Sequence, residues 1–173
     1  MSGVDYAAAE IKVRDDITKA HQRAWQRLAE PGTWWTGAER VAIAAEVRNA
    51  VKCALCRERK SALSPHAVEG THDSLGVLPE QAVDVIHRVV TDPGRLSKAW
   101  YEKVLAGGLE DTHYVEIIGV VITVVTVDVF CRGVGVPLHQ QGPDGTHRRE
   151  GARAERVLLL NHGPRSRATG GAR

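Results

Sequence analysis

The chain has 173 residues, of which 43% are hydrophobic, 25% charged and 5% aromatic, and its formal net charge is +2. This composition is that of an ordinary globular domain and excludes a collagen-like, a fully disordered or a disulfide-rich secreted chain. No uninterrupted apolar run reaches the roughly 18 residues that span a bilayer, and the first residues lack the pattern of a signal peptide. We therefore expect a cytoplasmic protein with no membrane partner.

The charge is unevenly distributed along the chain. Residues 140–173 contain seven Arg, no Lys and three acidic residues, a net charge of +4, so residues 1–139 carry −2. The same tail is rich in Gly and has no aromatic residue. We expect one folded domain over residues 1–139 and a flexible basic tail over residues 140–173, with no nucleic-acid partner.

Apolar spacing predicts helices throughout the folded part and no strand. The predicted helices span about residues 5–30, 36–62, 79–91, 96–106 and 114–130. Thr36 and Glu39 form a capping box at the start of the second helix. Trp34 and Trp35, in the preceding connection, are expected in the core because indole rings carry a large apolar area.

The last of these segments, residues 114–130, is the ambiguous one. Its β-branched residues favour a strand, but its 17 residues far exceed the usual strand length of about five or six. A helix that is apolar on nearly every side is expected to be buried all round, in a core or a subunit interface. Glu116 and Asp128 lie in this helix, where we expect each to face a partner or an interface. The fold class is therefore all-α, a helical bundle.

Cys53 and Cys56 form a C-x-x-C motif, the one motif of the sequence that suggests reactive side chains, and several Lys and Arg residues surround it. The thiolate is the reactive form of cysteine, and neighbouring cations lower the pKa of a thiol. Glu46 lies seven residues before Cys53, so an unbroken helix would place both on one face. The Glu46 carboxylate could relay a proton there or pair with a nearby base. Two small buried residues in a helix would give the same C-x-x-C spacing.

Four short phrases occur in order along residues 36–137: AERVAIAAE, CALCR, AWYE and YVEIIG, the last at the start of the long apolar helix. With these phrases the chain resembles the AhpD-like superfamily of alkylhydroperoxidases and carboxymuconolactone decarboxylases, and most closely its peroxidase-related branch. The resemblance implies an all-helical homo-oligomer that reduces a small hydroperoxide at the C-x-x-C pair. It implies a dithiol reductant as the second partner and no cofactor.

The resemblance also implies roles for individual residues. By motif position Cys56 would be the peroxidatic thiol, Cys53 the resolving thiol and Glu46 the acid of a proton relay. The chain departs from the family pattern because Glu46 lies closer to the first Cys, and because the family's His shortly after the second Cys is missing. His66 or Glu116 could rebuild the relay, or the relay could be absent.

Two alternatives from other classes remain open. One is a structural zinc site, since C-x2-C-x9-H-x5-H spacing places two thiolates and two imidazoles within reach of a tetrahedral ion. Its ligands would be Cys53, Cys56, His66 and His72. The other alternative is a non-catalytic helical oligomerisation module with the AhpD-like fold.

One cysteine and three histidines have no expected role in the site. Cys131 is predicted to be a small buried apolar side chain rather than a third redox partner. Surface positions or helix ends account for the three histidines: His21, His87 and His113.

Overall fold

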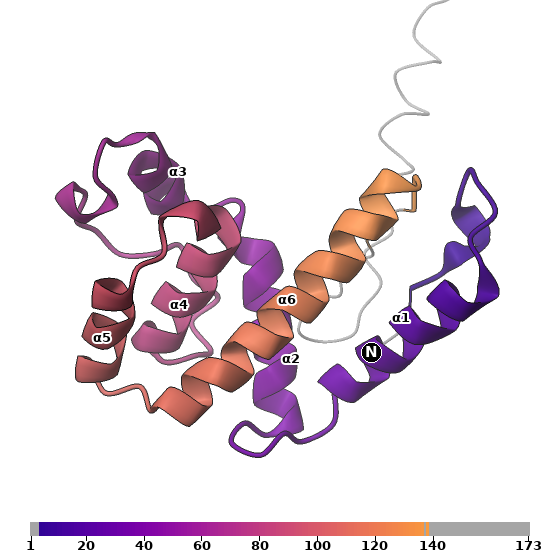
Figure 1. The fold of residues 1–173 in the computed structure, drawn as a ribbon, viewed down its shortest axis with the longest axis horizontal. Coiled ribbons are helices and arrows are strands. Elements are labelled where there is room, and N and C mark those ends of the chain that lie inside the picture. Colours follow the sequence, from indigo (N-terminus) through magenta and orange to yellow (C-terminus); the bar gives the residue numbers. More distant parts are fainter. Residues whose placement is uncertain (1–3, 137, 139–173) are drawn as a thin grey trace, which may run out of the picture. The chain divides into compact units, whose positions relative to one another are not determined.

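The structure, a computed structural model, describes residues 4–136 and 138. These residues form six α-helices and three short 3-10 helices, with no strand among them, which confirms the predicted all-α class (Figure 1). The chain divides into a compact unit, Met1–Leu138, and a second unit, His139–Arg173. The second unit, and with it the predicted basic tail, lies outside the described residues.

The helices follow the predicted order, with differences in the first two. The α-helices are α1 (Asp15–Leu28), α2 (Gly37–Ala50), α3 (Ala54–Ser61), α4 (Glu80–Thr91), α5 (Lys98–Ala106) and α6 (Asp111–Gly133). The 3-10 helices are Tyr6–Ala8, Pro65–Ala67 and Pro93–Arg95. The first predicted helix is therefore shorter than expected, and the second is divided into α2 and α3.

Helix α2 begins at the capping box that the sequence predicts. Thr36 Oγ1 accepts the Glu39 backbone N–H at 3.3 Å, and the Glu39 carboxylate accepts the Thr36 backbone N–H at 2.8 Å. Each bond satisfies a donor that a helix N-terminus would leave unpaired. The backbone at Gly37 lies against the end of α1, because a Cβ at Gly37 would lie 2.3 Å from the carbonyl oxygen of Ala29.

The continuous helix predicted over residues 36–62 is wrong, because the chain is extended at Cys53. Cys53 is the N-cap of α3 but makes no side-chain cap hydrogen bond. Asp73 supplies the cap instead, and its Oδ2 accepts the Ala54 N–H at 2.7 Å. Since Asp73 belongs to the loop between α3 and α4, no local pattern reveals this break. Glu46 and Cys53 are therefore not joined by two turns of one helix.

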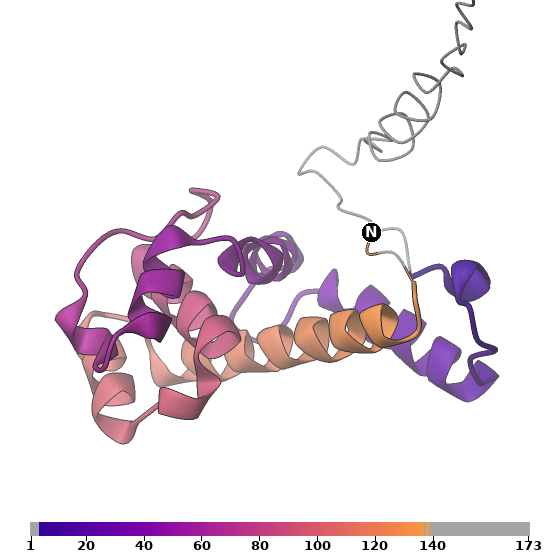
Figure 2. The same cartoon turned by 90° about the horizontal axis from the view of Figure 1, so that it is seen from above.

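The core forms where α6 packs on α2 and α4, and α6 also contacts α1 (Figure 1, Figure 2). The buried residues of α6 include Ile117, Val120, Val121, Val124 and Val127. The prediction of a helix is confirmed, and within the single chain one face of α6 is buried in the core while the opposite face is exposed. Its length and hydropathy would also suit a membrane span, a property that core helices share. Three residues of its outer face are exposed by more than half: Val115 (62%), Ile122 (56%) and Val129 (57%).

Glu116 and Asp128, the two acidic residues singled out in this helix, have partners within the chain. Asp128 accepts two hydrogen bonds from the Arg48 guanidinium, at 2.9 and 2.7 Å. Glu116 Oε2 accepts the Trp34 backbone N–H at 2.9 Å, and Glu116 Oε1 lies 3.5 Å from Arg40 Nε. These contacts tie α6 to α2 and to the connection before it.

The two tryptophans of that connection have different surroundings. Trp35 is buried as expected, and its Nε1 donates to the carbonyl oxygen of His113 at 3.1 Å. Trp34 is 45% exposed, so its assignment to the core is wrong. Only one of the two indole rings therefore closes the end of the core.

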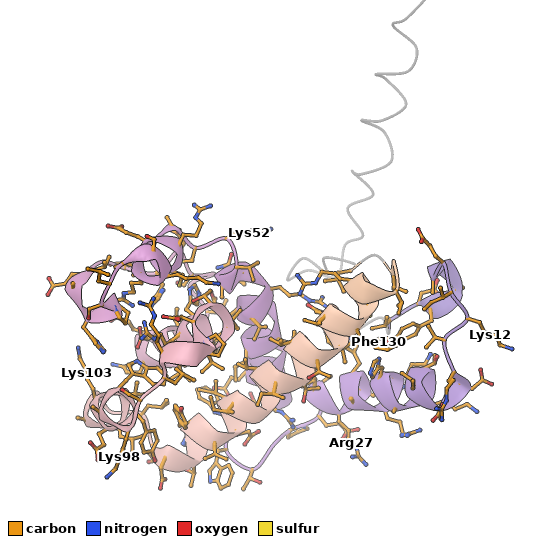
Figure 3. All side chains as sticks on the ribbon, turned by 45° about the horizontal axis from the view of Figure 1, so that its top comes forward. Lys12, Arg27, Lys52, Lys98, Lys103 and Phe130 are labelled. Carbon is orange, nitrogen blue, oxygen red and sulfur yellow. The ribbon has the colours of Figure 1, made fainter. Side chains whose placement is uncertain are left out.

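The N-terminal segment packs on the end of α6. Figure 3 shows Phe130 beside α1, where its ring meets the His21 ring edge-on with centroids 5.0 Å apart. Tyr6 hydrogen-bonds to His21, and the Cys131 thiol contacts the Tyr6 hydroxyl at 3.6 Å. Cys131 is fully buried here, as predicted.

Candidate active site

Two cysteines and two histidines converge where α3 and α4 meet the loop between them. The sulfur and nitrogen atoms of Cys53, Cys56, His72 and His87 all lie within 4.8 Å of one another. Cys56 Sγ is 3.4 Å from Nδ1 of His72 and 3.4 Å from Nδ1 of His87. Cys53 Sγ is 3.7 Å from the same His72 nitrogen. All three cysteines of the chain are free thiols and are buried.

A buried carboxylate binds the ring nitrogen of His87 that faces away from Cys56. Glu46 Oε1 lies 2.8 Å from His87 Nε2, and the two side chains are 1% and 0% exposed. A carboxylate only accepts hydrogen bonds, so Nε2 carries a proton, and Nδ1 is the ring nitrogen that faces Cys56. Glu46 is fixed in turn by the side-chain amide of Asn49 at 2.9 Å and the Leu75 N–H at 3.0 Å.

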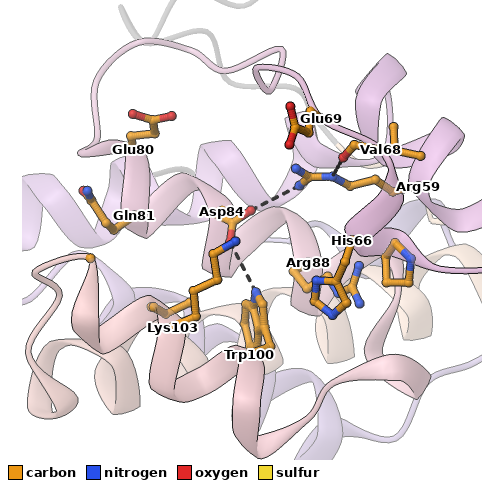
Figure 4. Close-up of a pocket in the computed structure, with 13 residues that line it drawn as sticks. Arg59, His66, Val68, Glu69, Glu80, Gln81, Asp84, Arg88, Trp100 and Lys103 are labelled. Carbon is orange, nitrogen blue, oxygen red and sulfur yellow. Dashed lines mark hydrogen bonds and ion pairs between the residues drawn. The ribbon is translucent and has the colours of Figure 1, made fainter.

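A second carboxylate holds His72 in the same way. Asp84 Oδ1 lies 3.0 Å from His72 Nε2, and Asp84 also accepts hydrogen bonds from Arg59 and from Trp100 Nε1, both at 3.3 Å. Asp84 borders a pocket of about 370 Å³ that Arg59, Trp100 and Lys103 also line (Figure 4). The Asp84 side chain is 34% exposed and so lies between His72 and this pocket, whereas the Glu46 and His87 side chains are buried.

The surroundings of Cys56 favour its ionised form. Burial raises the pKa of the Cys56 thiol, but hydrogen bonds with His72 and His87 outweigh it and lower the pKa to about 6. Burial lowers the pKa of His72, but Asp84 and the two sulfurs outweigh it and raise the pKa to about 10. The pKa of His87 rises to about 9 against the effect of burial, through Cys56 and Glu46. A Cys56 thiolate facing protonated imidazole is therefore the favoured state near neutral pH.

Cys53 has a different environment. Its Sγ accepts the Asp73 backbone N–H at 3.4 Å. Burial raises the pKa of this thiol, but backbone N–H groups of Cys56 and Asp73 and the His72 ring lower it overall. Only one imidazole nitrogen approaches Cys53, against two for Cys56, so the two thiols are not equivalent.

The loop between α3 and α4 is tied down over this site. The Asn49 side-chain amide donates to the Asp73 carbonyl oxygen at 2.6 Å, and Arg59 Nε donates to the Val68 carbonyl oxygen at 3.1 Å. The Leu75 N–H that bonds to Glu46 belongs to the same loop. These bonds place His72 against the two sulfurs.

Of the five catalytic residues predicted from the sequence, three lie at this site and two lie elsewhere. Cys53, Cys56 and Glu46 meet here, although Glu46 reaches Cys56 through His87 rather than directly. His66 is exposed and lines the pocket of Figure 4 without joining the group of four. Glu116 is occupied with Trp34 and Arg40. The structure therefore does not place the side chain of His66 or Glu116 beside either sulfur.

Sequence reasoning missed His87 and Asp84 and used His72 only in the zinc alternative. The assignment of His87 to a surface or helix end is wrong, because it is 0% exposed. One signal was present: His87 follows Val83 by four residues and so continues the buried face of α4. The candidate ligand set of the zinc alternative also changes, because the four residues that lie close enough to hold a metal ion are Cys53, Cys56, His72 and His87, without His66.

Comparison with family models, with curated protein sequences and with solved structures finds no match to the chain.

Proposed function

We propose that the protein is a thiol-dependent hydroperoxide reductase with Cys53 and Cys56 as its redox pair. One observation carries this proposal: Cys56 Sγ lies 3.4 Å from two imidazoles, each held by a carboxylate on its far nitrogen. Such an arrangement activates a thiol and keeps a proton donor beside it. The resemblance to AhpD-like alkylhydroperoxidases supports the same reading.

In the first step the Cys56 thiolate attacks the terminal oxygen of a hydroperoxide. The O–O bond breaks, a sulfenic acid forms on Cys56, and the leaving alkoxide takes a proton from an imidazolium to become an alcohol. His87 and His72 both stand at hydrogen-bonding distance from the sulfur for this transfer. His72 then regains a proton from solvent through the pocket beside Asp84.

In the second step Cys53 resolves the sulfenic acid. Its sulfur attacks Cys56 Sγ, the S–O bond breaks, and water leaves with the thiol proton of Cys53. A dithiol reductant of the cytoplasm returns two electrons and two protons to the disulfide. The net reaction converts a hydroperoxide and a dithiol into an alcohol, water and a disulfide.

Peroxide consumption with excess dithiol tests this proposal. We expect turnover by the wild type and its loss in Cys56→Ser, with Cys131→Ser as the matched control because Cys131 is buried against Tyr6. Turnover that survives in Cys56→Ser, or is absent in chelator-treated wild type, contradicts the proposal.

The outer face of α6 supports a second proposal, that the protein forms a homo-oligomer. Val115, Ile118, Ile122, Val125 and Val129 follow one another at spacings of three and four, which is the apolar repeat of a helix–helix seam. Val115, Ile122 and Val129 are more than half exposed. We place a second copy of the chain on this stripe, since a helix with the same repeat is its natural complement.

The oligomeric state in solution tests this assembly. Ile122→Lys is expected to give a monomer by light scattering, whereas Leu63→Lys, at a fully exposed loop position outside α6, is expected to leave the assembly intact. A wild-type monomer, or an unchanged mass for Ile122→Lys, contradicts it.

A further inference from the structure

The sulfur and nitrogen atoms of the redox cluster also have the composition and spacing of a tetrahedral metal site. In a zinc site with Zn–S of about 2.3 Å and Zn–N of about 2.05 Å, tetrahedral angles place each sulfur about 3.6 Å from each nitrogen. The three sulfur–nitrogen distances recorded here are 3.4, 3.4 and 3.7 Å. The remaining pairs among the four atoms lie within 4.8 Å of one another, so the four atoms are close enough together to share one ion.

The histidines are already held as metal ligands require. Zinc-bound imidazoles donate their other N–H to a carboxylate or carbonyl, which fixes the tautomer that coordinates. Here Glu46 and Asp84 do so on His87 Nε2 and His72 Nε2, at 2.8 and 3.0 Å. Each carboxylate holds the Nε2 proton, so loss of the other ring proton on metal binding would leave Nδ1 of both histidines free to coordinate.

Charge balance and burial favour the same occupant. Two thiolates and one divalent cation sum to zero, so the ion removes the cost of burying two anionic sulfurs. Thiolate and imidazole ligands in a tetrahedral set select Zn²⁺ among the common divalent ions. Four protein ligands leave no open position, which is the pattern of a closed site and not of a catalytic one.

We propose that Cys53, Cys56, His72 and His87 bind Zn²⁺ in the reduced protein and that the ion masks both thiols. The binding itself is independent of peroxide chemistry, whereas the masking rests on the proposed function. A zinc-loaded protein would be a stored form whose thiols neither alkylate nor react with peroxide. Removal of the ion would release the active pair.

Cobalt titration of the reduced, chelator-treated full chain tests the site without any activity assay. We expect one equivalent of Co²⁺ to give the intense visible spectrum of a tetrahedral ion with a thiolate charge-transfer band, and one equivalent of Zn²⁺ to remove it. Oxidised protein and His87→Gln are expected to lose the spectrum, whereas His66→Gln retains it because His66 lies outside the cluster. A weak octahedral spectrum in the reduced wild type overturns the proposal.

Two further measurements complete the test. Glu46→Gln, which removes a carboxylate behind a ligand, is expected to weaken zinc affinity by about 10–100-fold. Zinc loading is expected to block alkylation of both cysteines, and unhindered alkylation in the loaded protein overturns the masking. If metal-free protein consumes no peroxide while the cobalt spectrum is tetrahedral, the proposed function fails and the metal site stands.

Discussion

Glu46 Oε1 lies 2.8 Å from Nε2 of His87, although 41 positions separate the two residues in the chain. This bond joins α2 to α4 inside the protein, where neither side chain meets solvent. Its direction fixes which nitrogen of His87 faces Cys56, since the carboxylate binds only the protonated one. A buried ion pair of this kind orients a reacting group more than it stabilises a fold.

The Glu46→Gln variant is expected to lower peroxide turnover by about 100-fold, the usual scale of an acid–base contribution. The amide preserves the size of the side chain but removes the negative charge that helps to raise the pKa of His87. Initial rates of peroxide consumption at neutral pH measure the effect. Glu116→Gln is the matched control and is expected to turn over normally, because Glu116 contacts Trp34 and Arg40 instead. Equal rates in wild type and Glu46→Gln would remove Glu46 from the relay.

The pH dependence of thiol alkylation in metal-free protein provides a second prediction. The thiolate fraction of Cys56 rises as the pH passes upward through its pKa of about 6, so its rate with iodoacetamide is expected to level off near neutrality. A thiol at the ordinary value of 9.0 would still be gaining rate there. Cys131 is the internal comparison, since burial raises the pKa of its thiol. A Cys56 profile that rises only above about pH 8 would show an unactivated thiol.

Local patterns predicted the helices well because each helix shows its own caps and apolar face. The capping box of Thr36 and Glu39 and the long helix α6 are examples. The break at Cys53 could not be predicted, because its cap comes from Asp73 in a distant loop. The loop that follows also brings His72 to the sulfurs, so both histidines of the site depend on tertiary contacts.

The C-x-x-C pair itself was visible in the sequence, because its spacing is local. The chain of contacts from Glu46 through His87 to Cys56 was not visible, since these residues come from three different helices. His66 was a reasonable choice by distance along the chain alone. The structure places it at the pocket on the outer side of Asp84 and leaves His87, from the apolar face of α4, beside the thiol.

Arg48→Met is expected to destabilise the protein by about 3 kcal/mol, the lower end of the cost of removing one partner from a buried ion pair. The Asp128 side chain is 5% exposed and would keep its charge without the bidentate guanidinium. The Arg48 guanidinium also stacks 4.7 Å from the centre of the Trp25 ring, so its packing is lost as well. Denaturant unfolding measures the change, and a loss below about 0.5 kcal/mol would class the pair with ordinary surface bridges.

Gly37→Ala is expected to destabilise the junction of α1 and α2 by about 1–3 kcal/mol, because the new Cβ would lie 2.3 Å from a backbone oxygen. Gly94→Ala is the matched control, since a Cβ there meets nothing within 4 Å. Thermal unfolding of both variants gives the comparison. Equal melting temperatures would show that the connection shifts without cost.

Peptide mass mapping after one equivalent of hydroperoxide, with chelator-treated protein and no added reductant, shows whether Cys53 and Cys56 form the redox pair. We expect a Cys53–Cys56 disulfide and a free Cys131, because the first two sulfurs share one cluster and the third is buried against Tyr6. Cys53 and Cys56 recovered as free thiols, or a disulfide that includes Cys131, would contradict it.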